Sequence, residues 1–167
     1  TRAIMFTNPG NPTGAVLSEP QMRVIADVAK AHNLFVIGDE VYREFVYGGE
    51  RMLTIGMYDD IAENAVIIDS VSKRFSACGA RIGALISKNK ALMQHAQKLS
   101  QGRLSVATLD QIAAADLYDV DESYFAQMRK EYKLRRDTAY RRLIAMPGVV
   151  CAEPKGAFYI VAKLPVD

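Results

Sequence analysis

Apolar residues along the chain gather in short runs separated by segments with a different periodicity. The runs Ala3–Phe6, Leu34–Ile37 and Ala65–Ile68 are short and bounded by polar residues, which predicts strands, the third of them over Ala65–Asp69. Between the first two runs, residues 18–32 repeat apolar side chains at helical spacing after a capping-box start at Ser18–Gln21, which predicts a helix. A strand, a helix and a strand in this order are typical of the parallel crossover unit of an α/β sheet.

The remainder of the chain continues the alternation and then changes character. Further predicted elements are a strand over Ala80–Ser87, helices over 89–102, 108–118 and 122–145, and a strand pair over Val149–Ala152 and Ala157–Ala162. The pattern predicts an α/β fold with a mostly parallel sheet and helices on both faces, followed by the start of a small α+β C-terminal domain. We place the larger domain at residues 1–125, and the connecting helix with the beginning of the smaller domain at 126–167.

Composition and charge narrow the range of functions. The 167 residues are half hydrophobic and carry a formal net charge of +2. That balance argues against a nucleic-acid partner, so the basic cluster over 129–142 is interpreted as a solvated helix face. No apolar run has membrane-spanning length. Two isolated cysteines, Cys78 and Cys151, favour a reducing, cytoplasmic compartment, and the two histidines are not spaced as metal ligands, so no metal is expected.

Polar residues follow two of the predicted strands where ligands bind in open α/β sheets. Asp39 ends the second strand and is either a buried acceptor or a helix cap. The loop Thr7–Gly14 holds two Asn-Pro pairs and two glycines, so it is rigid. Such a loop is either an ordinary turn or a support for a preorganised amide at a site.

The segment Asp69–Gly83 is the centre of the pattern. It joins two apolar runs through a polar turn that contains Ser70, Ser72, Lys73 and Arg81. A lysine at this place is either a solvated turn residue or a covalent anchor for an anionic carbonyl cofactor. In the second case the hydroxyls and the guanidinium are suited to hold the cofactor's phosphate.

Taken together, these segments resemble the fold-type I, class I/II aminotransferases that use pyridoxal 5'-phosphate. The resemblance extends over nearly the whole chain, and four motifs occur in the family's order. They are Asn8-Pro-Gly-Asn-Pro-Thr-Gly14, Asp39-Glu-Val-Tyr42, Ser70-Val-Ser-Lys73 and Gly79-Ala-Arg-Ile-Gly83, with Pro154-Lys-Gly-Ala-Phe-Tyr159 resembling the opening of the C-terminal domain.

The resemblance implies a role for each matching residue. Lys73 would form the Schiff base with the cofactor aldehyde and then move the substrate's α-proton, which needs a neutral amine. Asp39 would pair with the pyridine nitrogen and keep it protonated, so that the ring accepts electrons.

The other matching residues would hold the cofactor in place. Asn11 and Tyr42 would hydrogen-bond its phenolic oxygen. Ser70 and Arg81 would bind its phosphate, and Ser72 would assist. The resemblance places the ring-stacking aromatic residue and the arginine that binds the substrate carboxylate outside this chain.

The implied reaction passes an amino group between an amino acid, aspartate-type or of broad range, and a 2-oxo acid. The resemblance also implies a homodimer. Residues Gly102–Thr108, however, do not match the family's usual sequence at the place where a partner subunit is contacted. We expect the chain to be an internal fragment that is inactive alone. The alternatives are a pyridoxal-phosphate C–S lyase, an enzyme similar to aminocyclopropane-carboxylate synthases, or an aminotransferase-like sensor domain of a transcription regulator.

Overall fold

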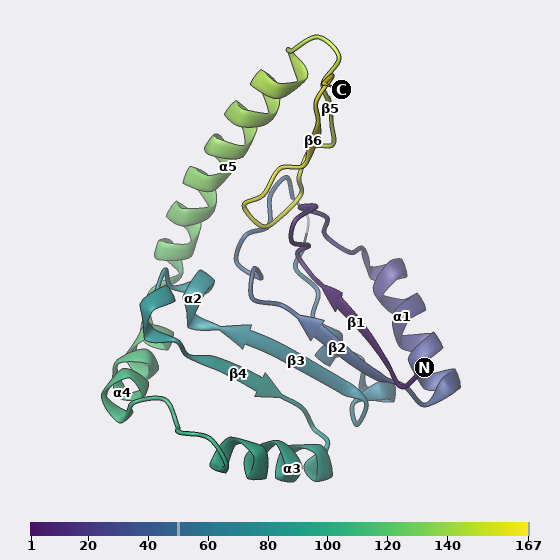
Figure 1. Cartoon of the computed structure of the whole chain (residues 1–167), viewed down its shortest axis with the longest axis vertical. Helices are drawn as coiled ribbons and strands as arrows, with labels where there is room; N and C mark the ends of the chain where they lie inside the picture. The colour runs from purple at the N-terminus through teal and green to yellow at the C-terminus, as the bar shows by residue number, and fades with distance from the viewer. Residues whose placement is uncertain (50, 167) are drawn as a thin grey trace. The chain divides into compact units, whose positions relative to one another are not determined.

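The computed structural model describes residues 1–49 and 51–166. The chain forms two compact units, shown in Figure 1. The first unit comprises Thr1–Asn8, Leu17–Val41 and Leu53–Val120, and the second comprises Pro9–Val16, Tyr42–Met52 and Asp121–Asp167. The predicted division into domains 1–125 and 126–167 stays a prediction. Asp167, the last residue of the second predicted domain, lies outside the described residues.

A four-stranded sheet forms the frame of the first unit (Figure 1). Its strands are β1 (Ala3–Thr7), β2 (Phe35–Asp39), β3 (Ala65–Ser70) and β4 (Gly83–Ile86), in that spatial order. β1, β2 and β3 are parallel, and β4 runs antiparallel to β3. The predicted α/β fold with a mostly parallel sheet is confirmed.

Helix α1 (Glu19–His32) connects β1 to β2, as the sequence predicts. At its start the backbone N–H of Ser18 donates to Oε1 of Gln21 at 2.9 Å, which supplies part of the predicted capping box. At its end Asn33 adopts the left-handed conformation, in which asparagine is tolerated better than most residues. The helix therefore begins and ends where local chemistry dictates.

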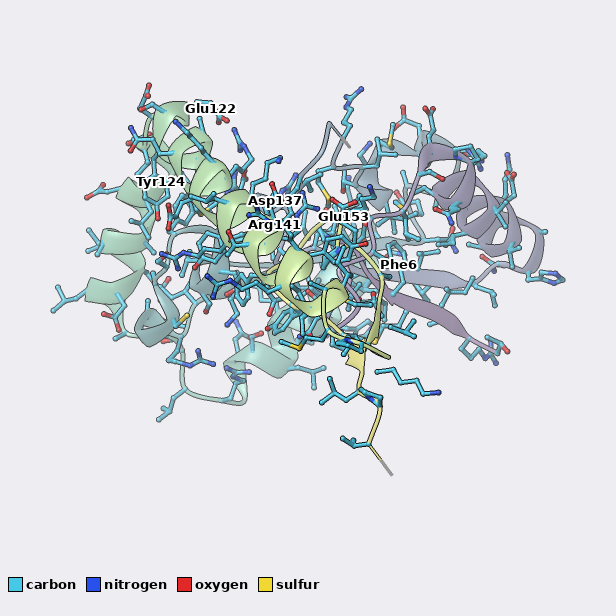
Figure 2. The ribbon with its side chains drawn as sticks, turned by 90° about the horizontal axis from the view of Figure 1, so that it is seen from above. Phe6, Glu122, Tyr124, Asp137, Arg141 and Glu153 are labelled. Carbon is cyan, nitrogen blue, oxygen red and sulfur yellow. The ribbon has the colours of Figure 1, made fainter. Side chains whose placement is uncertain are left out.

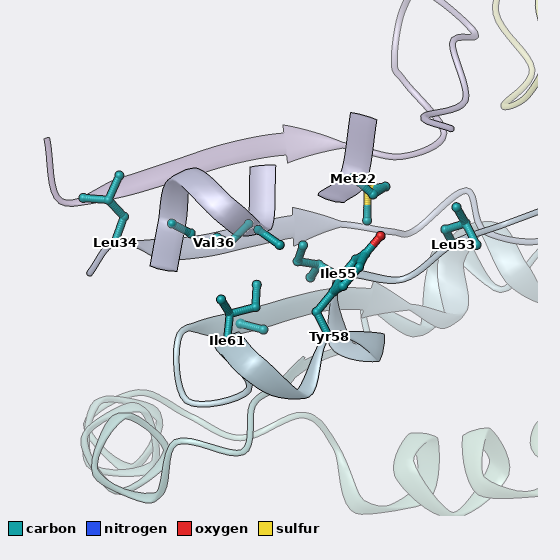
Figure 3. Packing of buried hydrophobic residues seen from close by; sticks show 10 residues of the cluster. Met22, Leu34, Val36, Leu53, Ile55, Tyr58 and Ile61 are labelled. Carbon is teal, nitrogen blue, oxygen red and sulfur yellow. The ribbon is translucent and has the colours of Figure 1, made fainter. Parts of the chain in front are cut away.

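The core of the first unit lies between α1, the sheet and the segment after residue 52. Figure 3 shows residues of this core as sticks and labels Met22, Leu34, Val36, Leu53, Ile55, Tyr58 and Ile61. Burying a large apolar side chain contributes roughly 1.5–3 kcal/mol, so this cluster stabilises the unit. In β2, Val36 is fully buried whereas Phe35 is 37% exposed, so the described residues cover one face of this strand more completely than the other.

Short helices complete the first unit. They are α2 (Val71–Arg74), α3 (Lys90–Gln101) and α4 (Thr108–Asp116), with 3₁₀ turns at Ile55–Met57, Asp59–Ile61, Cys78–Ala80 and Leu117–Asp119. Asn89 caps α3, since its Oδ1 accepts from the backbone N–H of Leu92 at 2.9 Å. The strand expected over Ala80–Ser87 is shorter than predicted, because Arg81 is left-handed (φ 55°) and β4 begins only at Gly83.

The second unit contains α5 (Glu122–Ile144) and the short strands β5 (Val150–Cys151) and β6 (Ala162–Lys163). Asp121 caps α5 by accepting from the backbone N–H of Ser123 at 2.8 Å. Figure 2 labels Glu122 and Tyr124 in the first turn of α5 and Asp137 and Arg141 further along it.

The prediction of a strand over Ala157–Ala162 is wrong for most of that range. Only Ala162 and Lys163 pair with β5. Ala157 is left-handed, with φ 54°, and its N–H donates to the carbonyl of Phe45 at 2.8 Å. This segment is therefore fixed by contacts with a distant part of the chain and not by its own apolar pattern.

None of the helices in the described part of the chain combines the length and apolarity needed to cross a lipid bilayer.

Candidate functional site

The candidate residues of the first unit gather at one edge of its sheet. β2 and β3 are parallel, and their register places Asp39 opposite Ile68, close to the carboxyl end of β3. Ser70 ends β3 opposite Gly83, where the antiparallel β4 begins, two residues after Arg81. The backbone thus brings Asp39, the lysine segment and Arg81 to the same edge, which is where open α/β sheets bind ligands.

Asp39 is a half-buried acceptor at this edge. Its Oδ1 accepts from the backbone N–H of Val41 at 3.3 Å, and its backbone carbonyl accepts from the N–H of Asn8 at 2.9 Å. Residues 41–44 form a turn, so the helix-cap alternative for Asp39 is wrong. The carboxylate lies at the strand end, where it is suited to accept from a cationic N–H.

Ser70 links β3, α2 and β4. Its Oγ accepts from the N–H of Ser72 at 3.0 Å, which caps α2, and donates to the carbonyl of Ile82 at 3.0 Å. A hydroxyl has one proton and two lone pairs, so this arrangement leaves one lone pair over. For Ser70 to donate to a phosphate, its proton has to leave the carbonyl of Ile82.

Lys73 lies in α2 and is half-buried. The residue after it is held firmly: the guanidinium of Arg74 lies 3.5 Å from the buried carboxylate of Asp69. The same guanidinium lies 5.3 Å from the ring centroid of Phe75 and 5.4 Å from that of Tyr118. These contacts pack the side chain of Arg74, the residue next to Lys73, within the first unit.

Arg81 ends a backbone turn that departs from regular structure. Both Ser76 and Arg81 have φ near 55°, a left-handed conformation that non-glycine residues adopt at a cost of roughly 1–3 kcal/mol. The side chain of Arg81 is exposed, and its Nη1 donates to the carbonyl of Cys78 at 2.9 Å. Strained residues of this kind gather at functional sites.

Asn11 and Tyr42 belong to the second unit. Asn11 is exposed and precedes Pro12 through a cis peptide bond. Its loop closes tightly, because the N–H of Gly10 donates to the carbonyl of Ala15 at 2.7 Å. Tyr42 is 5% exposed, and its hydroxyl shares a short hydrogen bond with the hydroxyl of Tyr159.

Glycine is required at position 14 of this loop. Gly14 has φ 67°, and an added Cβ would lie 2.5 Å from Cβ of Pro154. Its carbonyl accepts from the N–H groups of Lys155 and Gly156, both at 2.8 Å. The Asn-Pro loop is therefore tied to the segment that carries Tyr159.

Three buried polar residues were not singled out from the sequence as parts of a site. Asn8 is fully buried, and its side chain donates to the carbonyl of Leu53 and accepts from the N–H of Leu17, both at 3.0 Å. Glu40 is also fully buried and accepts from the N–H of Ile55 at 3.0 Å. Asp69 holds Arg74 beside Lys73. The only sequence signal for them is their position next to the strand-end motifs.

Within residues 1–49 and 51–166, no group of three or more histidine, cysteine or acidic side chains is placed to hold a metal ion.

Comparison with known proteins identifies the family. The family model described as "Aminotransferase class I and II" matches residues 1–167. The chain is 35% identical over 166 residues to the aspartate aminotransferase of Pyrococcus horikoshii, covering 98% of this chain and 42% of the relative. It is 31% identical over 161 residues to the aspartate aminotransferase of Bacillus subtilis, covering 96% of this chain and 41% of the relative.

A solved structure agrees with the sequence relatives. The aromatic aminotransferase from Pyrococcus horikoshii superposes with a TM-score of 0.88 at 36% identity, covering 96% of this chain and 43% of that structure. The chain thus spans less than half the length of the relatives it matches. It belongs to the aminotransferase class I and II family.

Proposed function

We propose that the protein to which this chain belongs is a pyridoxal-phosphate-dependent aminotransferase that exchanges an amino group between an amino acid and a 2-oxo acid. The observation that carries the proposal is the meeting of Asp39, Ser70, Lys73 and Arg81 at one sheet edge in a member of this family. Aspartate or an aromatic amino acid is the favoured substrate, since relatives with these names match the chain at 35% and 36% identity.

The residues at this edge fit the proposed cofactor by their chemistry. A pyridine nitrogen that carries a proton requires an anionic acceptor, which Asp39 supplies. A phosphate requires donors and positive charge, which Arg81 supplies together with the hydroxyls of Ser70 and Ser72. An aldehyde requires an amine, and Lys73 is the amine of this segment. We propose that Asn11 and Tyr42 hold the ring's phenolic oxygen.

In the proposed reaction the candidate residues of this chain divide the tasks among them. When bound, pyridoxal phosphate supplies a ring that stabilises negative charge at the substrate's α-carbon. The Nζ atom of Lys73 would anchor the cofactor. Once displaced by the substrate amine, it would take the proton from the substrate's α-carbon and deliver it to the cofactor's C4′. Asp39 would keep the pyridine nitrogen protonated, and Arg81 would hold the phosphate end of the cofactor in place.

Two further proposals follow from the family. The protein is proposed to act as a homodimer in the cytoplasm, where free amino acids and 2-oxo acids are available to it. Residues 1–167 alone are expected to be inactive, because the resemblance places the substrate-carboxylate arginine outside them.

An isotope-transfer assay tests the proposed reaction in the full-length protein. Aspartate or tyrosine labelled with ¹⁵N is supplied together with unlabelled 2-oxoglutarate, and the label is expected in glutamate. Lys73→Ala is expected to lower the rate by at least about a thousand-fold, since a nucleophile and general base is removed. Lys88→Ala is the matched control, because Lys88 is exposed and ion-paired with Asp59.

The products separate the proposal from its rivals. Release of labelled ammonia in place of labelled glutamate indicates an elimination enzyme. Cofactor binding without any turnover in the unaltered protein indicates a sensor. Either result contradicts the proposed transamination.

A further inference from the structure

Tyr42 and Tyr159 form a hydrogen-bonded pair of phenols inside the second unit. Tyr42 is 5% exposed, and the Tyr159 side chain is half-buried. A buried hydroxyl that loses its partner is destabilised by about 1–3 kcal/mol, so the pair holds its geometry. Tyr159 is outside the residues to which the family resemblance assigns a task.

Aromatic packing fixes the orientation of both rings. The ring of Tyr42 lies edge-on to Phe158 at 5.0 Å and to Tyr159 at 5.4 Å between centroids. Phe45 packs edge-on to Phe158, with 5.1 Å between the ring centroids. Edge-on packing of this kind is the geometry that aromatic rings prefer. Neither hydroxyl can turn away from the other without disturbing these contacts.

The backbone keeps the two tyrosines in register. The N–H of Ala157 donates to the carbonyl of Phe45, and the hydroxyl of Tyr47 donates to the carbonyl of Ala157, both at 2.8 Å. Tyr42 is three residues from Phe45, and Tyr159 is two residues from Ala157. Burial raises the pKa of the Tyr47 hydroxyl, so this donor keeps its proton across the working range of pH.

The number of protons on the two hydroxyls determines which tyrosine donates the hydrogen bond between them. A phenol has one proton to donate and lone pairs to accept with. If Tyr42 donates its proton to the cofactor's phenolic oxygen, the bond between the two tyrosines has to run from Tyr159 to Tyr42. Accepting a hydrogen bond polarises the Tyr42 hydroxyl and makes it a stronger donor.

We infer that Tyr159 is a positioning residue that aims the proton of Tyr42 at the cofactor's phenolic oxygen. This inference rests on the proposed function, and it adds to it a residue from the Pro154–Tyr159 segment. Tyr159 acts through Tyr42 and needs no contact of its own with cofactor or substrate.

The test is a pH titration of the visible absorption of the full-length protein loaded with pyridoxal phosphate. A bond donated to the phenolic oxygen stabilises its deprotonated form, so a weaker bond raises the pH midpoint of the colour change. Tyr159→Phe removes one oxygen atom and is expected to raise that midpoint by about half a pH unit. Tyr42→Phe is expected to raise it further.

Two comparisons make the result specific. Tyr132→Phe is the matched control, because Tyr132 packs in the same cluster at 5.0 Å from Phe45 but its hydroxyl is outside the Tyr42–Tyr159 pair. This variant is expected to leave the midpoint unchanged. In the Tyr42→Phe background, Tyr159→Phe is expected to have no further effect, since its task is carried out through Tyr42.

Each outcome decides one question. An unchanged midpoint in Tyr159→Phe, or the same shift in Tyr132→Phe, overturns the inference while cofactor binding stands. A second, additive shift in the Tyr42→Phe background also overturns it, because Tyr159 then acts independently of Tyr42. If the unaltered protein shows no cofactor band at all, the proposed function fails and the inference fails with it.

Discussion

In the first unit, Ser70 and Arg81 are held by backbone atoms of their own segment, whereas in the second unit Tyr42 is held by Tyr159, which is 117 residues away along the chain. The lysine segment of the first unit is fixed by a strand end, a short helix and a left-handed turn. The Tyr42 region of the second unit is fixed by aromatic rings and by a buried arginine on α5.

This difference determines whether a substitution destabilises only its own segment or also distant parts of its unit. A side chain whose partners are local can be changed with little effect outside its segment. A side chain that joins distant segments cannot, because its loss leaves buried groups without partners in several places. Substitutions in the second unit are therefore expected to lower stability most, and substitutions in the first unit to act mainly on cofactor binding.

The largest loss of stability is expected from Arg136→Ala. Arg136 is 8% exposed, and its Nε lies 2.6 Å from Asp137 and its Nη1 3.2 Å from Glu153. Nη1 also donates to the carbonyl of Pro154. Removing a buried charged partner is expected to lower the free energy of unfolding by about 4 kcal/mol, measured by urea denaturation.

Arg135→Ala is the matched control for that substitution. Arg135 is the neighbouring residue on α5, is exposed, and pairs with Glu131 at 2.8 Å. The expected loss is below about 1 kcal/mol. Equal losses in the two variants would show that the buried bonds of Arg136 do not hold the second unit together.

Gly14→Ala is expected to have the next largest effect. The added Cβ meets Pro154 at 2.5 Å, and φ is 67°, so steric overlap and backbone strain together cost about 3 kcal/mol. In Gly48→Ala, φ is 75° and no atom lies within 4 Å of the added Cβ, so only the strain of about 1 kcal/mol is expected. The difference between the two urea midpoints measures the overlap alone.

A smaller effect is expected in the first unit from Ser70→Ala. The substitution removes the cap of α2 and is expected to lower the free energy of unfolding by about 1 kcal/mol. Ser70→Asp restores an acceptor for the N–H of Ser72 but places a negative charge where phosphate is proposed to bind. Stability should recover in this variant while the affinity for pyridoxal phosphate falls, and recovery of both would argue against a phosphate contact at Ser70.

The smallest expected effect is on the pH dependence of folding stability, through a carboxyl group on the surface of the first unit. A hydrogen bond from Arg23, followed by one from Lys30, lowers the pKa of Asp60 below its ordinary value of 3.8. A carboxyl with a lowered pKa in the folded state contributes stability above its ordinary pKa, and this stability is lost as the pH falls through the folded value. Asp60→Asn should therefore reduce the change in urea midpoint between pH 7 and pH 3. An unchanged pH dependence would contradict this.

The parts of the fold that were predictable from the sequence have local causes. α1 follows from the Ser18–Gln21 start and its apolar spacing, and α3 follows from its Asn89 cap. β1, β2 and β3 follow from short apolar runs that end at polar residues. The meeting of Asp39 and the lysine segment at one edge follows from parallel strand order alone.

The parts that were not predictable depend on distant contacts. The apolar run after Gly156 has the composition of a strand, but the bond from Ala157 to Phe45 and the packing around Gly156 bend it instead. Nothing in the sequence near Tyr42 indicates that its partner is Tyr159. Periodicity is a property of neighbouring residues, so it does not report on contacts between residues that lie far apart along the chain.

The most direct test of the central claim is the visible absorption spectrum of the full-length protein after addition of pyridoxal phosphate, recorded beside Lys73→Ala and Lys88→Ala. We expect a cofactor band that responds to an added amino acid in the unaltered protein and in Lys88→Ala, and that is lost in Lys73→Ala. The same band in all three proteins would contradict it, because Lys73 would then not be the residue that holds the cofactor.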